Sequence, residues 1–414
     1  MMKQIFNYGT ETITASFPEQ IQSEILDSHV HTQLENEEET VRNACNHADI
    51  SLQEAVLRAK FIAIIVSDYS RPTGSQICTK IILEKLRQLG FPEERINIVI
   101  ALGLHRPATQ LEIDEITGGH YSPKITLENH NPDGNLIDVG NIQLNATVMA
   151  ADLIILTGAV TYHPMAGFSG GYKSLLPGVA GRKSILENHR LFFLNGEKNP
   201  AIYPGSIQDN PVQNHIRSSC TKINRSIYCL NVVLGQDKYI SFAAAGSVDY
   251  AWQACCRYVD SINSVHIDQK FPFVVASAGG FPSDFSFYQC MKVLTNSSIA
   301  CEEKGQIVII AQCAHGWEID ETLLKWFALS PPEVAQRLCK NFRMDGLAVY
   351  MAMRIIKTHT VYLYSSLPSE EVRKAGMIPL KDTKTLEELV IKNGNRSIVV
   401  MPHGAQTLPI VREN

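Results

Sequence analysis

Several features are absent from the 414-residue sequence. No apolar run reaches the length of a membrane-spanning helix, and the amino-terminal residues lack the apolar stretch of a secretory signal. Basic residues are not in excess, because 37 lysines and arginines are outnumbered by 42 acidic residues and the net charge is −5. We therefore expect a cytoplasmic protein that binds neither nucleic acid nor a membrane.

The ten cysteines form no C-x-x-C pair, and Cys255 and Cys256 are adjacent rather than spaced for a bridge. This pattern argues against a structural zinc site and against a disulfide framework. We expect reduced cysteines that mostly pack in the interior. The chain is also longer than a single hydrophobic core usually accounts for, so two domains are expected.

Short apolar runs alternate with amphipathic segments along most of the chain. In the first half the runs cover 61–66, 96–101 and 153–156, with helices expected over 75–89 and 111–116. A second series covers 273–278, 307–311, 360–364 and 397–401, with a helix over 347–356. Apolar runs separated by helices are typical of buried parallel strands.

The predicted fold class is therefore α/β, with two lobes that each contain a mainly parallel sheet flanked by helices, and with the active site in the cleft between the lobes. A polar stretch over 261–270 is the candidate hinge. We expect a cofactor-binding catalytic domain at 1–265 and a second α/β domain, which completes the substrate site, at 271–414.

Polar residues follow three of the expected strands in the first half. These segments begin at Asp68, Gly103 and His163. Because the carboxyl ends of parallel strands lie side by side, the three segments should meet at one edge of the sheet. Any one of them could be an ordinary loop ion pair or a surface histidine, but their recurrence favours a functional site.

The segment 163–178 combines a histidine, a lysine and several glycines. It departs from the G-x-x-x-x-G-K-S pattern of triphosphate-binding loops, because Tyr172 occupies one of the fixed glycine positions. The backbone of Ser169-Gly170-Gly171 could still approach a phosphate closely, although a tight turn would have the same composition. Lys173 could be an exposed lysine, a phosphate ligand, or a nucleophile toward a carbonyl-type group.

Four further positions stand where a ligand could bind. His189 ends a short helix expected over 181–188, where it could cap that helix or bind a soft metal. Gln289 and Lys292 lie three residues apart near the start of another expected helix, so they share a face that suits a carboxylate, although a solvent-facing pair fits equally. His315 and His403 also follow strands and could line the cleft.

Four blocks of sequence together resemble the nickel-dependent lactate racemase family of 2-hydroxyacid racemases and epimerases. The blocks are Asp68-Tyr69-Ser70-Arg71-Pro72, Ala101-Leu102-Gly103-Leu104-His105-Arg106-Pro107, the segment 163–178 with His189, and Tyr288-Gln289-Cys290-Met291-Lys292. The most specific part is the ordered set of His163, Lys173 and His189. The resemblance covers nearly the whole chain.

The resemblance implies a bound nickel-pincer nucleotide, which is a pyridinium-3-thioamide-5-thiocarboxylic acid mononucleotide joined covalently to Lys173. Nickel would take His189 as its protein ligand, and His105 and His163 would be the catalytic acid and base. The remaining implied contacts are Arg71, Gln289 and Lys292 to the substrate carboxylate, and Asp68, Tyr288, Ser169, Gly170 and Gly171 around the cofactor. Cofactor-maturation enzymes are the implied partners.

A hydride-transfer mechanism explains why the site would need this cofactor and two histidines. The α-hydrogen of a 2-hydroxycarboxylate is a poor acid beside an anionic carboxylate, and hydride removal avoids the carbanion by giving a 2-keto acid. Each enantiomer then needs its own base for the hydroxyl proton. Lactate is the family's namesake substrate, but malate, 2-hydroxyglutarate, phenyllactate or an aldonate remain open for this chain.

Two other classes of function compete with a racemase. A non-catalytic nucleotide- or phosphate-binding protein of the same fold would be expected to have lost at least one of the histidines or Lys173. A zinc hydrolase using His163 and His189 lacks a convincing third ligand and a nearby general base.

Overall fold

The computed structural model describes residues 2–19, 23–28, 36–70, 72–235, 238–394 and 397–412. It divides into two compact units. Unit 1 contains the described residues up to Ser28, Phe193–Glu197 and those from Ile262 onward, and unit 2 contains those from Asn36 to Phe192 and Lys198–Ser261. The domain boundaries at 1–265 and 271–414 remain a prediction from the sequence.

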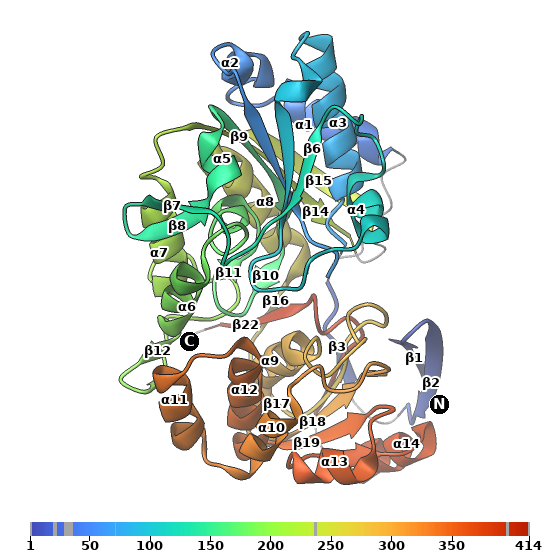
Figure 1. Cartoon of the computed structure of the whole chain (residues 1–414). Coiled ribbons are helices and arrows are strands. Elements are labelled where there is room, and N and C mark those ends of the chain that lie inside the picture. Colours follow the sequence, from blue (N-terminus) through green and yellow to red (C-terminus); the bar gives the residue numbers. More distant parts are fainter. Residues whose placement is uncertain are drawn as a thin grey trace. The chain divides into compact units, whose positions relative to one another are not determined.

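Unit 2 is built on a six-stranded sheet in the order β15-β14-β9-β4-β5-β6 (Figure 1). All neighbours in it are parallel except β14 and β15. Its strands are β4 (Ile62–Ser67), β5 (Ile96–Ala101), β6 (Thr126–Asn129), β9 (Leu153–Ala159), β14 (Ser226–Leu234) and β15 (Ile240–Gly246). Two small antiparallel pairs are β7 (Leu136–Val139) with β8 (Ile142–Asn145), and β10 (Tyr162–His163) with β11 (Gly167–Phe168).

Helices cover this sheet because its strands are apolar on both faces. Ile62, Ile64 and Val66 of β4 pack in one buried cluster with Ile82 and Leu86, and burying such side chains is the main favourable term in folding. The helices of unit 2 are α1 (Glu37–Asn46), α2 (Leu52–Val56), α3 (Ser75–Gln88), η1 (Glu93–Arg95), α4 (Gln110–Thr117), α5 (Ala146–Ala150), η2 (Gly171–Ser174), α6 (Arg182–Arg190), α7 (Pro211–Cys220) and α8 (Val248–Asn263).

Unit 1 has a second six-stranded sheet, in the order β20-β19-β18-β17-β21-β3, and every neighbouring pair is parallel. Its strands are β3 (Ser23–Ile25), β17 (Phe271–Ser277), β18 (Cys301–Ile310), β19 (Thr360–Tyr364), β20 (Ile378–Leu380) and β21 (Ile398–Met401). The shorter strands of the chain are β1 (Met2–Tyr8), β2 (Glu11–Phe17), β12 (Phe193–Leu194), β13 (Glu197–Lys198), β16 (Ser264–Ile267) and β22 (Leu408–Val411).

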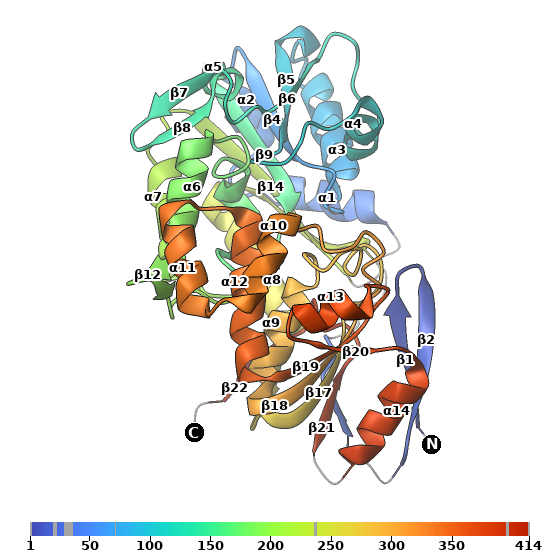
Figure 2. The same ribbon diagram turned by 60° about the horizontal axis from the view of Figure 1, so that its bottom comes forward.

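The amino-terminal hairpin of β1 and β2 packs beside the last helix, α14, as Figure 2 shows. Phe6 and Phe17 of this hairpin share a buried cluster with Phe273 of β17 and Leu386 of α14. The helices of unit 1 are α9 (Met291–Ala300), α10 (Glu321–Leu324), η3 (Lys325–Ala328), α11 (Pro331–Lys340), α12 (Met344–Thr358), α13 (Ser369–Lys374) and α14 (Thr383–Lys392).

The predicted α/β class with mainly parallel sheets is confirmed. All ten cysteines are free, and nine of them are buried. The polar stretch 261–270 contains β16, which pairs in parallel with β22, and the hinge remains a prediction from the sequence. In the described part of the chain no helix is long and apolar enough to cross a membrane.

Candidate active site

The strand order of unit 2 reverses between β4 and β9. From β4 the chain continues outward through β5 and β6, and it then returns to the other side of β4 as β9. Ligands of open α/β sheets bind at such a switch point, outside the carboxyl ends of the strands. Asp68 directly follows β4, His105 follows β5 and His163 follows β9, so the predicted segments lie at this position.

Asp68 and His105 form an ion-pair contact at this edge, between Oδ2 of the carboxylate and Nδ1 of the imidazole. Asp68 is 6% exposed, whereas half of the His105 side chain is exposed. The other carboxylate oxygen of Asp68 accepts a hydrogen bond from Oγ of Ser70 at 2.7 Å. A carboxylate at Nδ1 holds the ring proton on that nitrogen, so Nε2 of neutral His105 presents a lone pair.

The contacts of His163 favour the opposite tautomer to that of His105. Its Nδ1 accepts hydrogen bonds from the backbone N–H groups of Met165 at 3.2 Å and Ala166 at 3.1 Å. A nitrogen that accepts cannot carry the proton, so the neutral ring has its proton on Nε2. That Nε2 lies 3.5 Å from Nζ of Lys173.

Close packing holds the backbone around His163. Gly167 pairs with His163 in the hairpin of β10 and β11 and has a φ of 73°. A Cβ at this position would lie 1.8 Å from the carbonyl oxygen of Ser206, so only glycine fits.

The glycine loop packs against two residues that sequence reasoning missed. The N–H of Gly171 donates to Oδ1 of Asn231 at 2.8 Å, and the indole of Trp252 donates to the carbonyl oxygen of Ser169 at 2.8 Å. A Cβ on Gly170 would lie 2.6 Å from Val160. Asn231 lies fully buried within the apolar strand β14, and that isolated amide was the available signal. A phosphate contact from Ser169-Gly170-Gly171 remains a prediction.

Lys173 lies in the short helix η2 and is partly buried. Its N–H donates to the carbonyl oxygen of Gly170 at 3.1 Å, and its own carbonyl accepts from Gly178 at 3.0 Å. These backbone contacts fix the lysine within the glycine segment. Its ammonium group is close enough to His189 to lower the pKa of that imidazole.

His189 lies in the last turn of α6, on the buried face of the helix, and is 6% exposed. Burial is the main cause that lowers its pKa to about 4, and the positive charge of Lys173 adds to it. Nδ1 lies 2.7 Å from the carbonyl oxygen of Ile185, so it donates and Nε2 is the nitrogen with a lone pair. A neutral imidazole whose other nitrogen donates to a carbonyl is the usual form of a metal-binding histidine.

The substrate residues predicted in the second half belong to unit 1. Lys292 is in the first turn of α9, but α9 begins at Met291, so the expectation that Gln289 shares a helical face with Lys292 was wrong. The preceding turn is held by tertiary contacts, in which the N–H of Tyr288 donates to the carbonyl of Trp317 at 3.2 Å. The side chains of Tyr288, Gln289 and Lys292 are partly buried. Arg71, the other residue predicted to bind the substrate, lies outside the described residues.

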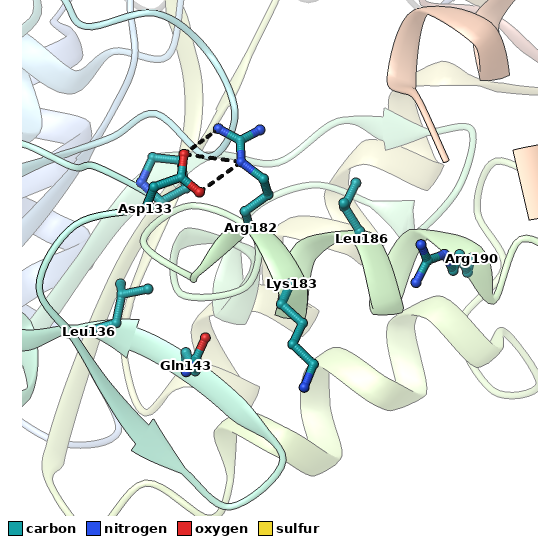
Figure 3. Close-up of a pocket in the computed structure, with 8 residues that line it drawn as sticks. Asp133, Leu136, Gln143, Arg182, Lys183, Leu186 and Arg190 are labelled. Carbon is teal, nitrogen blue, oxygen red and sulfur yellow. Dashed lines mark hydrogen bonds and ion pairs between the residues drawn. The ribbon is translucent and has the colours of Figure 1, made fainter. Parts of the chain in front are cut away.

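A surface pocket of about 480 Å³ lies on the other face of α6 (Figure 3). Arg182, Lys183 and Arg190 line it, and Arg182 forms an ion pair with Asp133 at 2.6 Å. His189 is on the buried face of the same helix, so this pocket is separate from the switch point.

The described residues contain no group of three or more histidine, cysteine, aspartate or glutamate side chains that could hold a metal ion. His189 offers one neutral imidazole nitrogen as a metal donor, and the positive charge of Lys173 is close to it. A buried neutral imidazole next to a lysine fits a tethered cofactor that supplies further donors.

This arrangement defines an α/β enzyme whose ionisable groups gather at the switch point of a parallel sheet. Two family models match the chain: the lactate racemase N-terminal domain over residues 8–200 and the lactate racemase C-terminal domain over residues 267–408. The chain belongs to the lactate racemase family and is an isomerase of the racemase type.

Relatives of known identity support this membership over most of the chain. The lactate racemase of Thermoanaerobacterium thermosaccharolyticum is 30% identical, with 98% of each chain covered. The lactate racemase of Lactiplantibacillus plantarum is 31% identical over 75% of this chain and 74% of that protein.

Solved structures agree with the fold. The lactate racemase apoprotein from T. thermosaccharolyticum superposes with a TM-score of 0.89 and 29% identity, and the match covers 100% of both chains. A Thermotoga maritima protein matches with a TM-score of 0.66 and 17% identity over 91% of this chain and 98% of that one, which shows a shared fold alone.

Proposed function

We propose that the protein inverts C2 of a small 2-hydroxycarboxylate by reversible hydride transfer, through a 2-keto acid. The observation that carries this proposal is the placement of His105, His163, Lys173 and His189 in the loops and helices around one switch point. The names of the relatives make lactate the first substrate to test.

The cofactor we propose is a nickel-pincer nucleotide joined to Lys173, with His189 as the protein ligand of nickel. When bound, this group would supply a reversible hydride acceptor for C2 of the substrate. His189 suits the role because its low pKa keeps Nε2 unprotonated at neutral pH. Lys173 suits the role because it is fixed by its backbone and stands beside His163.

His105 would accept the hydroxyl proton of one enantiomer. Its lone pair is on Nε2, and Asp68 stabilises the imidazolium that forms when this nitrogen gains the proton. The ring is half exposed, so a substrate can reach it.

His163 would serve the opposite enantiomer. Because its Nδ1 accepts two backbone N–H groups, Nε2 can become a base only when those contacts are broken and the ring proton moves to Nδ1. We therefore infer that the turn at Met165 and Ala166 rearranges during the catalytic cycle.

Arg71, Gln289 and Lys292 would bind the substrate carboxylate, since a guanidinium, an amide and an ammonium group all donate to carboxylate oxygens. Tyr288 and Ser169-Gly170-Gly171 would contact the nucleotide. Asp68 would support the cofactor site indirectly, through its contact with His105. The cofactor is not made from the chain itself, so maturation enzymes are the expected partners.

The test is intact-protein mass spectrometry combined with metal analysis, after co-expression with pincer-synthesis enzymes. We expect a mass increment on Lys173 and close to stoichiometric nickel, followed by optical inversion of single enantiomers of lactate, malate or glycerate. Unmodified Lys173 without nickel in matured protein would reject the mechanism. A nucleotide bound without any inversion would favour the non-catalytic binding protein.

A further inference from the structure

A buried asparagine from a distant helix contacts the turn that holds His163. Asn210 is the N-cap residue of α7, lies 45 residues after Met165 and is fully buried. Its Nδ2 donates to the carbonyl oxygen of Met165 at 2.8 Å. The hairpin and α7 both belong to unit 2, so this contact lies within one compact unit.

The partners at both ends of the Asn210 amide set its orientation. Oδ1 accepts from the backbone N–H groups of Val212 at 3.0 Å and Gln213 at 3.2 Å. Nδ2 donates to Oγ of Ser206 at 2.9 Å in addition to the carbonyl of Met165. If the amide were turned over, its NH₂ group would face two N–H donors and its oxygen would face a carbonyl. The network therefore keeps the donor directed at Met165.

The carbonyl of Met165 and the N–H of Ala166 belong to the same peptide group. That N–H donates to Nδ1 of His163 at 3.1 Å, so hydrogen bonds run from Asn210 through one peptide to the imidazole. Both Met165 and Ala166 are buried. In such surroundings hydrogen bonds in a chain polarise one another, and a carbonyl that accepts makes the N–H of its own peptide a stronger donor. The N–H of Met165 also donates to Nδ1, but it belongs to the preceding peptide group.

A stronger donor at Nδ1 favours the neutral tautomer of His163 that has its proton on Nε2. A proton on Nδ1 would instead face the N–H groups of Met165 and Ala166. Moving the proton there, as the base form of His163 requires, costs more free energy when these groups donate more strongly. Asn210 adds to that cost through the peptide group that it polarises.

We propose that Asn210 is a positioning residue for His163, and that it sets the free energy separating the resting tautomer of this histidine from its base form. The proposal rests on the proposed function, because that function gives His163 its acid–base role. The two ends of the amide serve different purposes. Oδ1 caps α7, which is a structural role, whereas Nδ2 acts on the turn of His163, so the two roles can be tested separately.

The test compares two variants of the full-length apoprotein by nuclear magnetic resonance. Asn210→Ser keeps an oxygen that can cap α7 but lacks the NH₂ group that donates to Met165, and Asn210→Ala loses both. In each variant the Ala166 amide proton should exchange with solvent about three- to tenfold faster relative to that of Met165, because its peptide has lost a hydrogen bond. The Nδ1 resonance of ¹⁵N-labelled His163 should move toward that of a nitrogen without a hydrogen bond.

Asn36→Ala is the matched control, because it removes the side chain that caps α1 and should leave both signals of the hairpin unchanged. In the wild type, Ala166 should already be the more protected of the two amides. A less protected Ala166 in the wild type, or wild-type signals in folded Asn210→Ser, would overturn the proposal. These measurements need no cofactor, so loaded enzyme that inverts no 2-hydroxycarboxylate would reject the proposed function without altering their outcome.

Discussion

The Nδ1 atom of His189 lies 2.7 Å from the carbonyl oxygen of Ile185, one helical turn earlier in α6. This hydrogen bond needs the proton on Nδ1, and burial leaves the second nitrogen unprotonated in the folded protein. The folded protein therefore prefers neutral His189, whereas the unfolded chain binds a proton there near its ordinary pKa.

Stability should consequently depend on pH through this residue. The folded pKa of about 4 lies below the ordinary value of 6.5, so the unfolded state binds more protons between these values and stability falls as the pH is lowered through that window. Urea unfolding of the apoprotein at several pH values measures the slope. His189→Gln should flatten it, and His120→Gln, at an exposed histidine, should not.

Two variants should affect covalent attachment of the cofactor and retention of nickel independently. Lys173→Arg should abolish the mass increment, because a guanidinium cannot form the tether. His189→Ala should keep the increment but lower nickel affinity by about tenfold or more. Intact mass and metal analysis of the same sample distinguish the two effects. Full nickel content in His189→Ala would mean that another group binds the metal.

Removing the carboxylate beside His105 should impair turnover. Asp68→Asn can no longer stabilise the imidazolium, so we expect kcat to fall by about 100-fold or more with the cofactor still attached. Ser70→Ala removes a neighbour that donates to the same carboxylate, and its effect should stay below about tenfold. Equal losses in both variants would contradict a specific role of Asp68 toward His105.

The two histidines proposed as acid and base should differ in tautomer. In apoprotein with ¹⁵N-labelled histidine at about pH 8, where ordinary imidazoles are neutral, His105 should carry its proton on Nδ1 and His163 on Nε2. The nitrogen chemical shifts report this directly. A proton on Nδ1 of His163 would show that Met165 and Ala166 do not hold the ring in solution.

The hairpin that carries His163 should not tolerate a larger residue at Gly167. Gly167→Ala would place a methyl group against the carbonyl oxygen of Ser206, so we expect a loss of about 3 kcal/mol or more in the free energy of unfolding. Gly119 also has a positive φ but nothing within 4 Å of a built Cβ. Gly119→Ala should cost only about 1–2 kcal/mol, and denaturant unfolding compares the two.

The sequence predicted several interior strands well because short, continuous apolar runs between helices leave few alternatives. The expected ranges 96–101 and 360–364 coincide with β5 and β19. The expected helix start within 287–292 was close, but α9 begins after Gln289, and no capping side chain marks its first residue. Cys290 at the cap forms no side-chain hydrogen bond to the helix, and the turn before it depends on backbone partners near Trp317.

Contacts between distant segments could not be predicted in the same way. β3 is a strand of only three residues, whose pairing with β21 joins opposite ends of the chain. Asn231 interrupts an apolar strand, but its contact with Gly171 depends on how β14 and the glycine loop pack. The histidines, the lysine and Asp68 were recognisable by type and order, while Asn231, Trp252 and the backbone groups that hold His163 were not.

The pairing of β3 with β21 also has a consequence for how the protein is made. Residues 23–25 leave the ribosome long before their partners in β21 are synthesised. The part of unit 2 that contains His105, Lys173 and His189 is synthesised after β3 and before β21. Unit 2 therefore has its full sequence while the sheet of unit 1 still lacks β21. Nascent chains therefore contain Lys173, the proposed attachment residue, in a completed sequence unit before unit 1 can close its own sheet.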